Sequence, residues 1–348
     1  MGKNTFPFMY MIPKFHKQPV GARYIAVASS CTTSKLSSAL SDLLSFVLMT
    51  LREEDSTRIA RTGVRRYFVV DTYEEVTNFL SRWRRTTDSS KRTGLYTGDF
   101  STMYTTLPHQ DLFDRVENAT HKAFEEGSRI IGMPFSATGL YWKRSSCFWK
   151  RYQGDTFKDN VISLSWNTLN SLIHFLVTNT YLKVGEHLYR QTVGVPMGTN
   201  AASALANLYC YSYEYEYILR VEIEKGRIYA RNFHMTFRLI DDVLSVDNPL
   251  MAEALSKPYE EGGIYPSALM LNKTSVTESS VEFIGIHIEA LENRFRLSVY
   301  DKRKSFPFHV RRYPLMSSLI PRSIPYGVFI GLLHRGYRIC SGVNDFLS

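Results

Sequence analysis

The feature that most constrains this chain of 348 residues is a pair of adjacent aspartates between two apolar runs. Asp241 and Asp242 separate Met235–Ile240 from Val243–Val246, and both runs are rich enough in β-branched and aromatic residues to predict strands. Two neighbouring carboxylates in such a setting are costly unless they lie in a tight turn that faces positive charge. We therefore expect a β-hairpin whose tip carries both acids.

A third aspartate and a glycine-containing loop accompany this doublet. The run Leu95–Phe100 predicts a strand that carries Asp99, and Tyr104 follows five positions after Asp99. The segment Gln191–Asn200 contains two glycines four positions apart and leads into a helical run. Each feature alone is ordinary in a turn or at a strand end. Their combination in this order is more specific than its parts and favours a shared site.

Three carboxylates on neighbouring strands would form an all-oxygen site of the kind that Mg²⁺ prefers. Two such ions, about 3.5–4 Å apart, can activate a primer 3′-hydroxyl and stabilise a leaving pyrophosphate in an in-line displacement. The chemistry needs no His or Cys ligand, which agrees with the absence of any zinc-type spacing among the four cysteines. The sequence therefore predicts a two-metal site for nucleotidyl transfer.

The charge of the chain favours an anionic partner, nucleic acid before membrane. The formal net charge is +9, and the basic surplus lies in residues 1–98 and 301–348. Solvated basic faces are the alternative interpretation. The widely spaced cysteines and the absence of an 18-residue apolar run predict an intracellular protein without a membrane span. The basic clusters Arg82–Arg85 and Lys91–Arg92 suggest a nuclear location, although such clusters equally bind phosphate.

Hydrophobic periodicity predicts a mixed α+β protein rather than a doubly wound sheet, because helices and strands alternate irregularly. Helices are expected over Ser34–Leu51, over Thr72–Trp83 with Asp71 as N-cap, from Pro108 through Asp111–Glu126 to Gly127, and over Asn167–Lys183 and Thr199–Leu219. A hairpin turn is expected at Gly185–Glu186, and Val281–Glu289 and Arg294–Tyr300 are expected to form a final pair of strands.

Over nearly its whole length the chain resembles a reverse transcriptase of the Penelope-like retroelement group, which is related to telomerase reverse transcriptase. The similar segments are Ile12–Lys17 and Arg23–Ile25 for the fingers, Asn167–Asn200 for motif B, Leu269–Thr274 for motif D, and Phe283–Gly285, Leu297–Lys302 and Arg338–Ser341 for the strand pair and the C-terminal tail. Two positions depart from the family pattern. Leu239 stands where Tyr is common, and Ala201–Ser203 lies where a Ser-Pro or Ala-Pro pair is common.

The resemblance implies an α+β right-hand polymerase fold, with an antiparallel palm sheet backed by helices. Residues 1–93 would be partial fingers, residues 94–300 a palm with motifs A to E and a fingers insertion at about 128–190, and residues 301–348 the start of a thumb or a C-terminal extension. The implied activity is that of an RNA-directed DNA polymerase, a nucleotidyltransferase that adds dNTPs to the 3′-hydroxyl of a DNA primer on an RNA template, with no membrane partner.

The same resemblance implies roles for individual residues. Two Mg²⁺ ions, or Mn²⁺, would be held by Asp99 and Asp241, with Asp242 as the third carboxylate. The backbone carbonyl of Phe100 would complete one metal shell, and Tyr104 would be a steric gate against a ribose 2′-hydroxyl. The triphosphate would be held by Lys14 and Arg23, the latter able to bind bidentately. Gly198 would allow close approach of backbone to nucleotide and template, and Lys273 would protonate the leaving pyrophosphate as a general acid.

Three other interpretations stay open at this stage. An RNA-dependent RNA polymerase commonly has a second Asp five positions after the first, where this chain has Tyr104, and a bulky ring there favours deoxynucleotides. A non-catalytic nucleic-acid-binding remnant would keep the basic flanks, and the chain begins within the expected fingers and ends near the start of the thumb, as a fragment would. A telomerase-like role at chromosome ends shares the same catalytic core.

Overall fold

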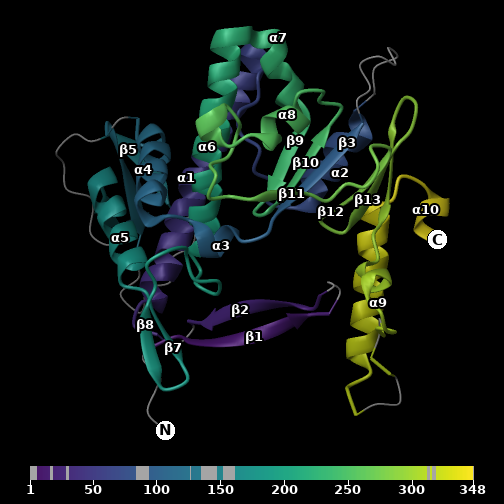
Figure 1. The fold of residues 1–348 in the computed structure, drawn as a ribbon, viewed down its shortest axis with the longest axis horizontal. Coiled ribbons are helices and arrows are strands. Elements are labelled where there is room, and N and C mark those ends of the chain that lie inside the picture. The colour runs from purple at the N-terminus through teal and green to yellow at the C-terminus, as the bar shows by residue number, and fades with distance from the viewer. Residues whose placement is uncertain are drawn as a thin grey trace.

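A computed structural model describes residues 6–15, 19–28, 31–83, 94–125, 127–134, 147–151, 161–311, 314–315 and 319–347. The chain is an α+β protein built around a four-stranded antiparallel sheet in the order β11-β3-β10-β9 (Figure 1). The strands are β3 (Leu95–Phe100), β9 (Thr236–Leu239), β10 (Asp242–Val246) and β11 (Leu271–Lys273). The strand expected at Leu95–Phe100 is confirmed. The two strands expected around the aspartate doublet are present, but Ile240 lies in the turn between them and Asp242 is the first residue of β10.

One face of this sheet packs against two long helices. The helices are α1 (Ser34–Thr62) and α6 (Ala202–Lys225), which lie side by side, with α4 (His109–Ala123) and α5 (Trp166–Thr178) on their far side (Figure 1). Phe100 and Val243 reach from the sheet into this core. Helix α6 buries most of its length, including a series of tyrosines, because most of its residues from Ala202 to Val221 are apolar or aromatic.

The opposite face of the sheet packs against a helix and a second sheet. The helix is α2 (Tyr73–Arg82), and the sheet is the meander β12 (Ser280–Phe283), β13 (Ile286–Ala290) and β14 (Phe295–Val299). Leu95, Leu244 and Phe237 pack into this second core. The helices α9 (Ser323–Ile339) and α10 (Val343–Leu347) follow β14 and pack against it.

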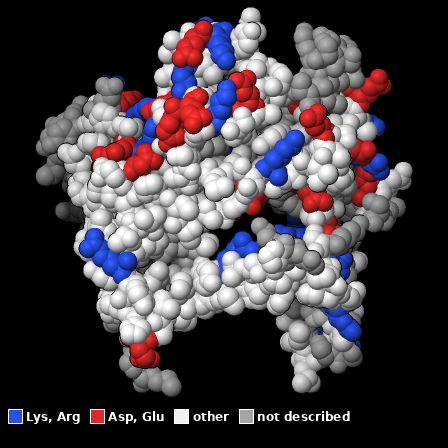
Figure 2. Space-filling view, viewed as in Figure 1, with Lys and Arg blue, Asp and Glu red and all other residues white. Residues whose placement is uncertain are grey.

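A two-stranded arm crosses beneath the central sheet. It consists of β1 (Phe8–Lys14) and β2 (Gly21–Val27), and β1 also meets β7 (Tyr181–Val184), which pairs with β8 (His187–Arg190). In Figure 1 the arm extends from β7 towards α9. Figure 2 shows a hollow between the arm and the body above it, with Lys and Arg side chains at its edge.

The remaining elements are short. A three-stranded sheet contains β4 (Arg129–Pro134), β5 (Phe148–Arg151) and β6 (Val161–Leu164), and the short helices are α3 (Met103–Thr106), α7 (Arg227–Ala230) and α8 (Met251–Ser256). Single 3₁₀ turns lie at Arg231–Met235, Tyr259–Glu261 and Lys302–Ser305. Within the described residues, no helix combines the length and apolar character that crossing a bilayer requires.

Several boundaries differ from the sequence-based expectations. Helix α1 continues to Thr62 and ends at Gly63, whose φ of 71° suits glycine. The N-cap position of α2 is Thr72, not Asp71. Helix α4 ends at Ala123, before the expected Gly127, because the chain turns at Phe124, whose carbonyl accepts a hydrogen bond from the amide of Arg129.

Two further segments were assigned to the wrong element. The expected helix over Asn167–Lys183 ends at Thr178, and Tyr181–Val184 is a strand because β7 finds partners in β1 and β8. The expected single strand over Val281–Glu289 is two strands, since Ile284 and Gly285 have positive φ and form a two-residue turn. The Gly185–Glu186 turn is confirmed.

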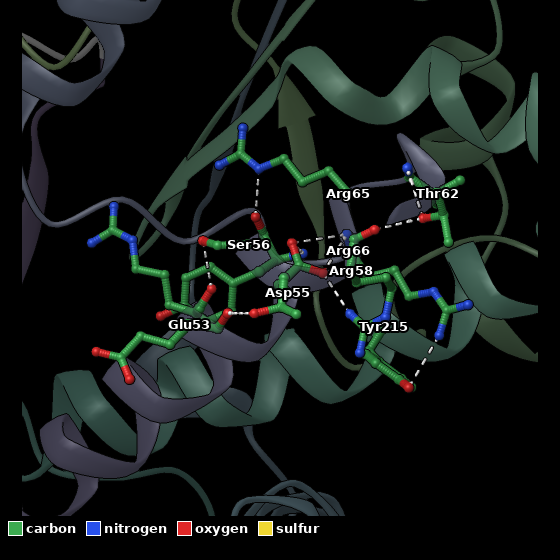
Figure 3. A network of polar contacts seen from close by, with 12 residues as sticks. Glu53, Asp55, Ser56, Arg58, Thr62, Arg65, Arg66 and Tyr215 are labelled. Atoms are coloured by element: carbon green, nitrogen blue, oxygen red, sulfur yellow. Dashed lines mark hydrogen bonds and ion pairs between the residues drawn. The ribbon is translucent and has the colours of Figure 1, made fainter. Parts of the chain in front are cut away.

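A buried carboxylate holds the segment that follows α1 and leads to the edge of the central sheet (Figure 3). Asp55 is 2% exposed, and it accepts hydrogen bonds from the backbone N–H groups of Arg66 (3.1 Å) and Tyr67 (3.2 Å). The next residues pair with β9: the N–H of Val70 donates to the carbonyl of Arg238 at 2.9 Å. The Asp55 network thereby holds the outer edge of the sheet against α1 and α6.

Candidate active site

The aspartate doublet lies at the tip of the β9–β10 hairpin. Leu239 pairs with Asp242, so Ile240 and Asp241 form a two-residue turn, with Ile240 at a φ of 55°. Asp242 also stands directly opposite Asp99 on β3. Residues directly opposite each other in an antiparallel pair project from the same face, with Cβ atoms about 4.5–5.5 Å apart. The backbone carbonyl of Asp241 accepts a hydrogen bond of 3.0 Å from the N–H of Phe100. The fold therefore brings the three predicted carboxylates to one end of the sheet.

Two of these acids, Asp241 and Asp242, have a raised pKa. Burial, then Asp241 and Asp99, raise the pKa of Asp242 to about 6, while Lys302 acts in the opposite direction. Burial and Asp99 also raise the pKa of Asp241. Half-buried carboxylates that repel one another are stabilised when a cation sits between them. The electrostatics of this group therefore suit a bound cation.

An all-oxygen donor set of this kind fits a hard divalent cation such as Mg²⁺. Among the described residues, however, no three His, Cys, Asp or Glu side chains already have the spacing of a metal site. The three aspartates would thus have to close around an ion.

The arm presents basic side chains to the aspartates. Arg23 on β2 pairs with Ile12 on β1, and Lys14 lies two residues beyond Ile12, so both basic side chains belong to one face of the arm. The pKa of Asp241 is raised overall, and the positive charges of Arg23 and Lys14 each act to lower it. The structure therefore brings Lys14 and Arg23 together, on the face of the arm that is turned towards the carboxylates.

The loop Gln191–Asn200 joins the arm to the region after β3. The N–H of Val195 donates to the carbonyl of Tyr104 at 2.7 Å, and the N–H of Ala26 donates to the carbonyl of Met197 at 2.8 Å. A Cβ on Gly198 would lie 2.1 Å from the carbonyl oxygen of Ala26, and the φ of Gly198 is 112°. The close approach that Gly198 permits in this structure is thus to strand β2.

Tyr104 lies at this junction. Its side chain is half-buried at the edge of the larger core. Burial and, to a lesser degree, Asp241 raise its pKa to about 12, and Arg23 acts in the opposite direction. The ring is therefore near both the aspartate group and the basic face of the arm.

Lys273 and Phe100 are placed differently from each other. Lys273 pairs with Gly98, one residue before Asp99, so its side chain belongs to the opposite face of the sheet from Asp99 and Asp242. Its Nζ lies 5.6 Å from the ring centroid of Tyr96. The structure does not bring Lys273 to the aspartates. The side chain of Phe100 is buried in the core, and its backbone borders Asp241.

Three residues near the site had no assigned role in the sequence analysis. Asn272 stands opposite Asp99 and donates a hydrogen bond to the hydroxyl of Ser101. The positive charge of Lys302 acts to lower the pKa of Asp242. Arg238 lies beneath the hairpin tip. A charge within an otherwise apolar strand was the available signal for Arg238, whereas Asn272 and Lys302 are ordinary polar residues in sequence.

The comparisons with known proteins concern the fold. No family model and no curated protein matches the chain. Solved structures do match: telomerase from Candida albicans in complex with a TWJ fragment of telomeric RNA has a TM-score of 0.54 and 16% identity over 88% of this chain and 47% of its own. Apo telomerase from Candida tropicalis has a TM-score of 0.54 and 15% identity over 95% and 52%, respectively. The chain spans about half the length of these structures, and at this level of sequence identity the similarity is one of fold.

Proposed function

We propose that the chain is a reverse transcriptase: an RNA-directed DNA polymerase that adds dNTPs to a primer 3′-hydroxyl. The observation that carries this proposal is the convergence of Asp99, Asp241 and Asp242 at one end of the sheet, facing an arm that presents Lys14 and Arg23. The fold shared with telomerases supports a polymerase core. Membership of the Penelope-like group belongs to this proposal and rests on the sequence motifs.

In right-hand terms, the central sheet with α6 would be the palm. The arm and the segments β4 to β8 would belong to the fingers, and residues after 301 would begin the thumb. The hollow between arm and sheet would receive the template and primer (Figure 2). One of the similar telomerases is in complex with a TWJ fragment of telomeric RNA, which supports RNA as a binding partner here.

The mechanism assigns tasks to the chain's own residues. Asp99, Asp241 and Asp242 would hold two Mg²⁺ ions, which supply charge stabilisation and an activated 3′-hydroxyl when bound. Lys14 and Arg23 would bind the triphosphate and neutralise its charge. The Tyr104 ring would fill the space that a ribose 2′-hydroxyl needs. Lys273 lies on the other face of the sheet, so we assign it no proton transfer.

Primer extension by the purified chain tests this function. RNA and DNA templates are compared, with deoxy- and ribonucleotides, in Mg²⁺ and in Mn²⁺. We expect extension on RNA with deoxynucleotides, abolished by Asp241→Asn and retained by Glu186→Gln, an acid at the exposed β7–β8 turn. Ribonucleotide incorporation at similar rates would favour an RNA polymerase. Salt-sensitive binding of the primer–template without any extension would favour a non-catalytic binding protein.

A further inference from the structure

A completely buried ion pair joins the central sheet to helix α6 beneath the proposed active site. Arg238 on β9 and Glu214 on α6 are both 0% exposed, and the Nε of Arg238 donates to Glu214 Oε1. The hydroxyl of Tyr265 donates to the same carboxylate oxygen at 2.8 Å. Taking two charges out of water is expensive, and apolar residues of similar volume are often as stabilising or more so. The pair therefore calls for an explanation beyond stability.

The hydrogen bonds of the guanidinium connect α6 to the hairpin tip. Its Nη1 donates to the side-chain oxygen of Asn207 (2.8 Å) and to the backbone carbonyl of Ile240 (3.1 Å), and its Nη2 donates to the backbone carbonyl of Asn207 (3.2 Å) and to Glu214. A planar, rigid fork of donors can make all of these contacts at once, and a lysine ammonium cannot. Arg238 thus connects the Ile240–Asp241 turn to helix α6 through hydrogen bonds.

The residue held in this way has a strained backbone. Ile240 has a φ of 55°, a conformation that β-branched residues rarely adopt. Strain of this kind persists only where the surroundings fix it, and it clusters at functional sites. The bond from Arg238 to the Ile240 carbonyl helps to fix the turn. A second bond joins the N–H of Phe100 to the carbonyl of Asp241, at 3.0 Å.

We propose that Arg238 is a positioning residue, which sets the Ile240–Asp241 turn and thereby the spacing of the metal-binding carboxylates. It touches neither substrate nor reacting atoms. Glu214 and Asn207 orient the guanidinium from α6, so the position of the turn depends on the packing of this largely buried helix against the sheet. This inference rests on the proposed function, because it assumes that the three aspartates bind metal.

The test compares metal binding with stability in Arg238→Lys. This variant keeps the positive charge beside Glu214 and loses the fork that reaches Ile240. Binding of Mn²⁺ to the chain with primer–template bound is measured by electron paramagnetic resonance, and the Mg²⁺ midpoint of primer extension is measured alongside. We expect Mn²⁺ affinity to fall and the Mg²⁺ midpoint to rise, each by about 10–100-fold. Affinity for the primer–template should stay unchanged.

The matched control is Arg66→Lys. Arg66 also forms a poorly exposed ion pair with α6, through Glu222, and it donates to the hydroxyl of Tyr215, away from the aspartates. A comparable loss of stability with no change in either metal midpoint is expected for this variant. If Arg238→Lys changes the metal midpoints no more than Arg66→Lys does, Arg238 has only a packing role and the proposal is overturned.

Two further variants keep the outcome decisive. If Arg238→Lys does not fold, Asn207→Ala is used, which removes one acceptor of the guanidinium. It should weaken Mn²⁺ binding several-fold, and unchanged binding would overturn the proposal. Asp241→Asn tests the proposed function separately: if wild type and Asp241→Asn bind Mn²⁺ equally, the metal site itself is refuted, and the role of Arg238 falls with it. Weaker binding in Arg238→Lys alongside Asp241-dependent binding in wild type supports both.

Discussion

Replacing Gly198 by alanine perturbs the contact between the Gln191–Asn200 loop and the arm. The new Cβ would lie 2.1 Å from the carbonyl oxygen of Ala26, so the two backbones must part by about 0.9 Å to reach even 3.0 Å. The φ of 112° costs a non-glycine residue about 1–3 kcal/mol. Loss of the Ala26 to Met197 hydrogen bond adds about 0.5–1.5 kcal/mol. We expect the free energy of unfolding to fall by about 2–4 kcal/mol.

The same displacement should affect substrate binding, because β2 carries Arg23 three residues before Ala26. A shift of about 1 Å in a positioning group can reduce activity by up to roughly 100-fold. We therefore expect Gly198→Ala to raise KM for dNTPs and to lower kcat/KM by about 10–100-fold. Urea denaturation followed by circular dichroism gives the stability, and steady-state primer extension gives the kinetic constants.

Gly185→Ala is the matched control, since Gly185 has a φ of 60° but no atom near its Cβ position. It should cost about 1–2 kcal/mol through backbone conformation alone and leave KM for dNTPs unchanged. If Gly198→Ala loses no more stability than Gly185→Ala, and KM for dNTPs is unaltered, the reasoning about this contact is wrong.

Three further predictions concern single side chains. Because the pKa of Asp242 is raised from 3.8 to about 6, the stability that its protonated form contributes is complete below pH 4 and is lost as pH rises through 6. Without metal at pH 7.5, Asp242→Asn should therefore raise the free energy of unfolding by about 2–3 kcal/mol, and it should abolish primer extension. Thermal melting between pH 4 and 7.5 measures the stability change. A variant that is less stable than wild type at pH 7.5 would contradict the prediction. Tyr104→Val should increase ribonucleotide incorporation relative to deoxynucleotide by about 10-fold or more, as measured by competing extension rates, and an unchanged ratio refutes the gate. Asp55→Ala leaves the buried N–H groups of Arg66 and Tyr67 without their acceptor. The free energy of unfolding, measured by urea denaturation, should therefore fall by about 2–5 kcal/mol, while Mn²⁺ affinity stays unaltered. A fall below about 1 kcal/mol would contradict the role of Asp55.

Local patterns in the sequence were sufficient where a structure depends on neighbouring residues. The strand Leu95–Phe100 and the hairpin at Asp241–Asp242 were predicted because β-branched runs and a polar doublet act over a few residues. Tyr181–Val184 was assigned to a helix although its partner β8 follows directly, because the apolar pattern of the preceding helix continues into it and its other partner, β1, lies far away in sequence. The turn at Ile284–Gly285 was missed because Ile rarely adopts positive φ, so its identity gave no signal for a turn.

The sequence by itself determined which polar and aromatic side chains are available for a site: three aspartates, basic residues near its start, and a bulky ring after the first aspartate. Only the tertiary structure decided which of these residues meet. Asp99 and Asp242 face each other because β3 and β10 pair in one register, and the same alternation along β11 sends Lys273 to the opposite face. Side chains along a strand alternate between the two faces of the sheet, so a shift of one residue in register moves a side chain from the face of the aspartates to the opposite face. Arg238 shows the same limit, since its role depends on α6, a helix remote in sequence, packing beneath the turn.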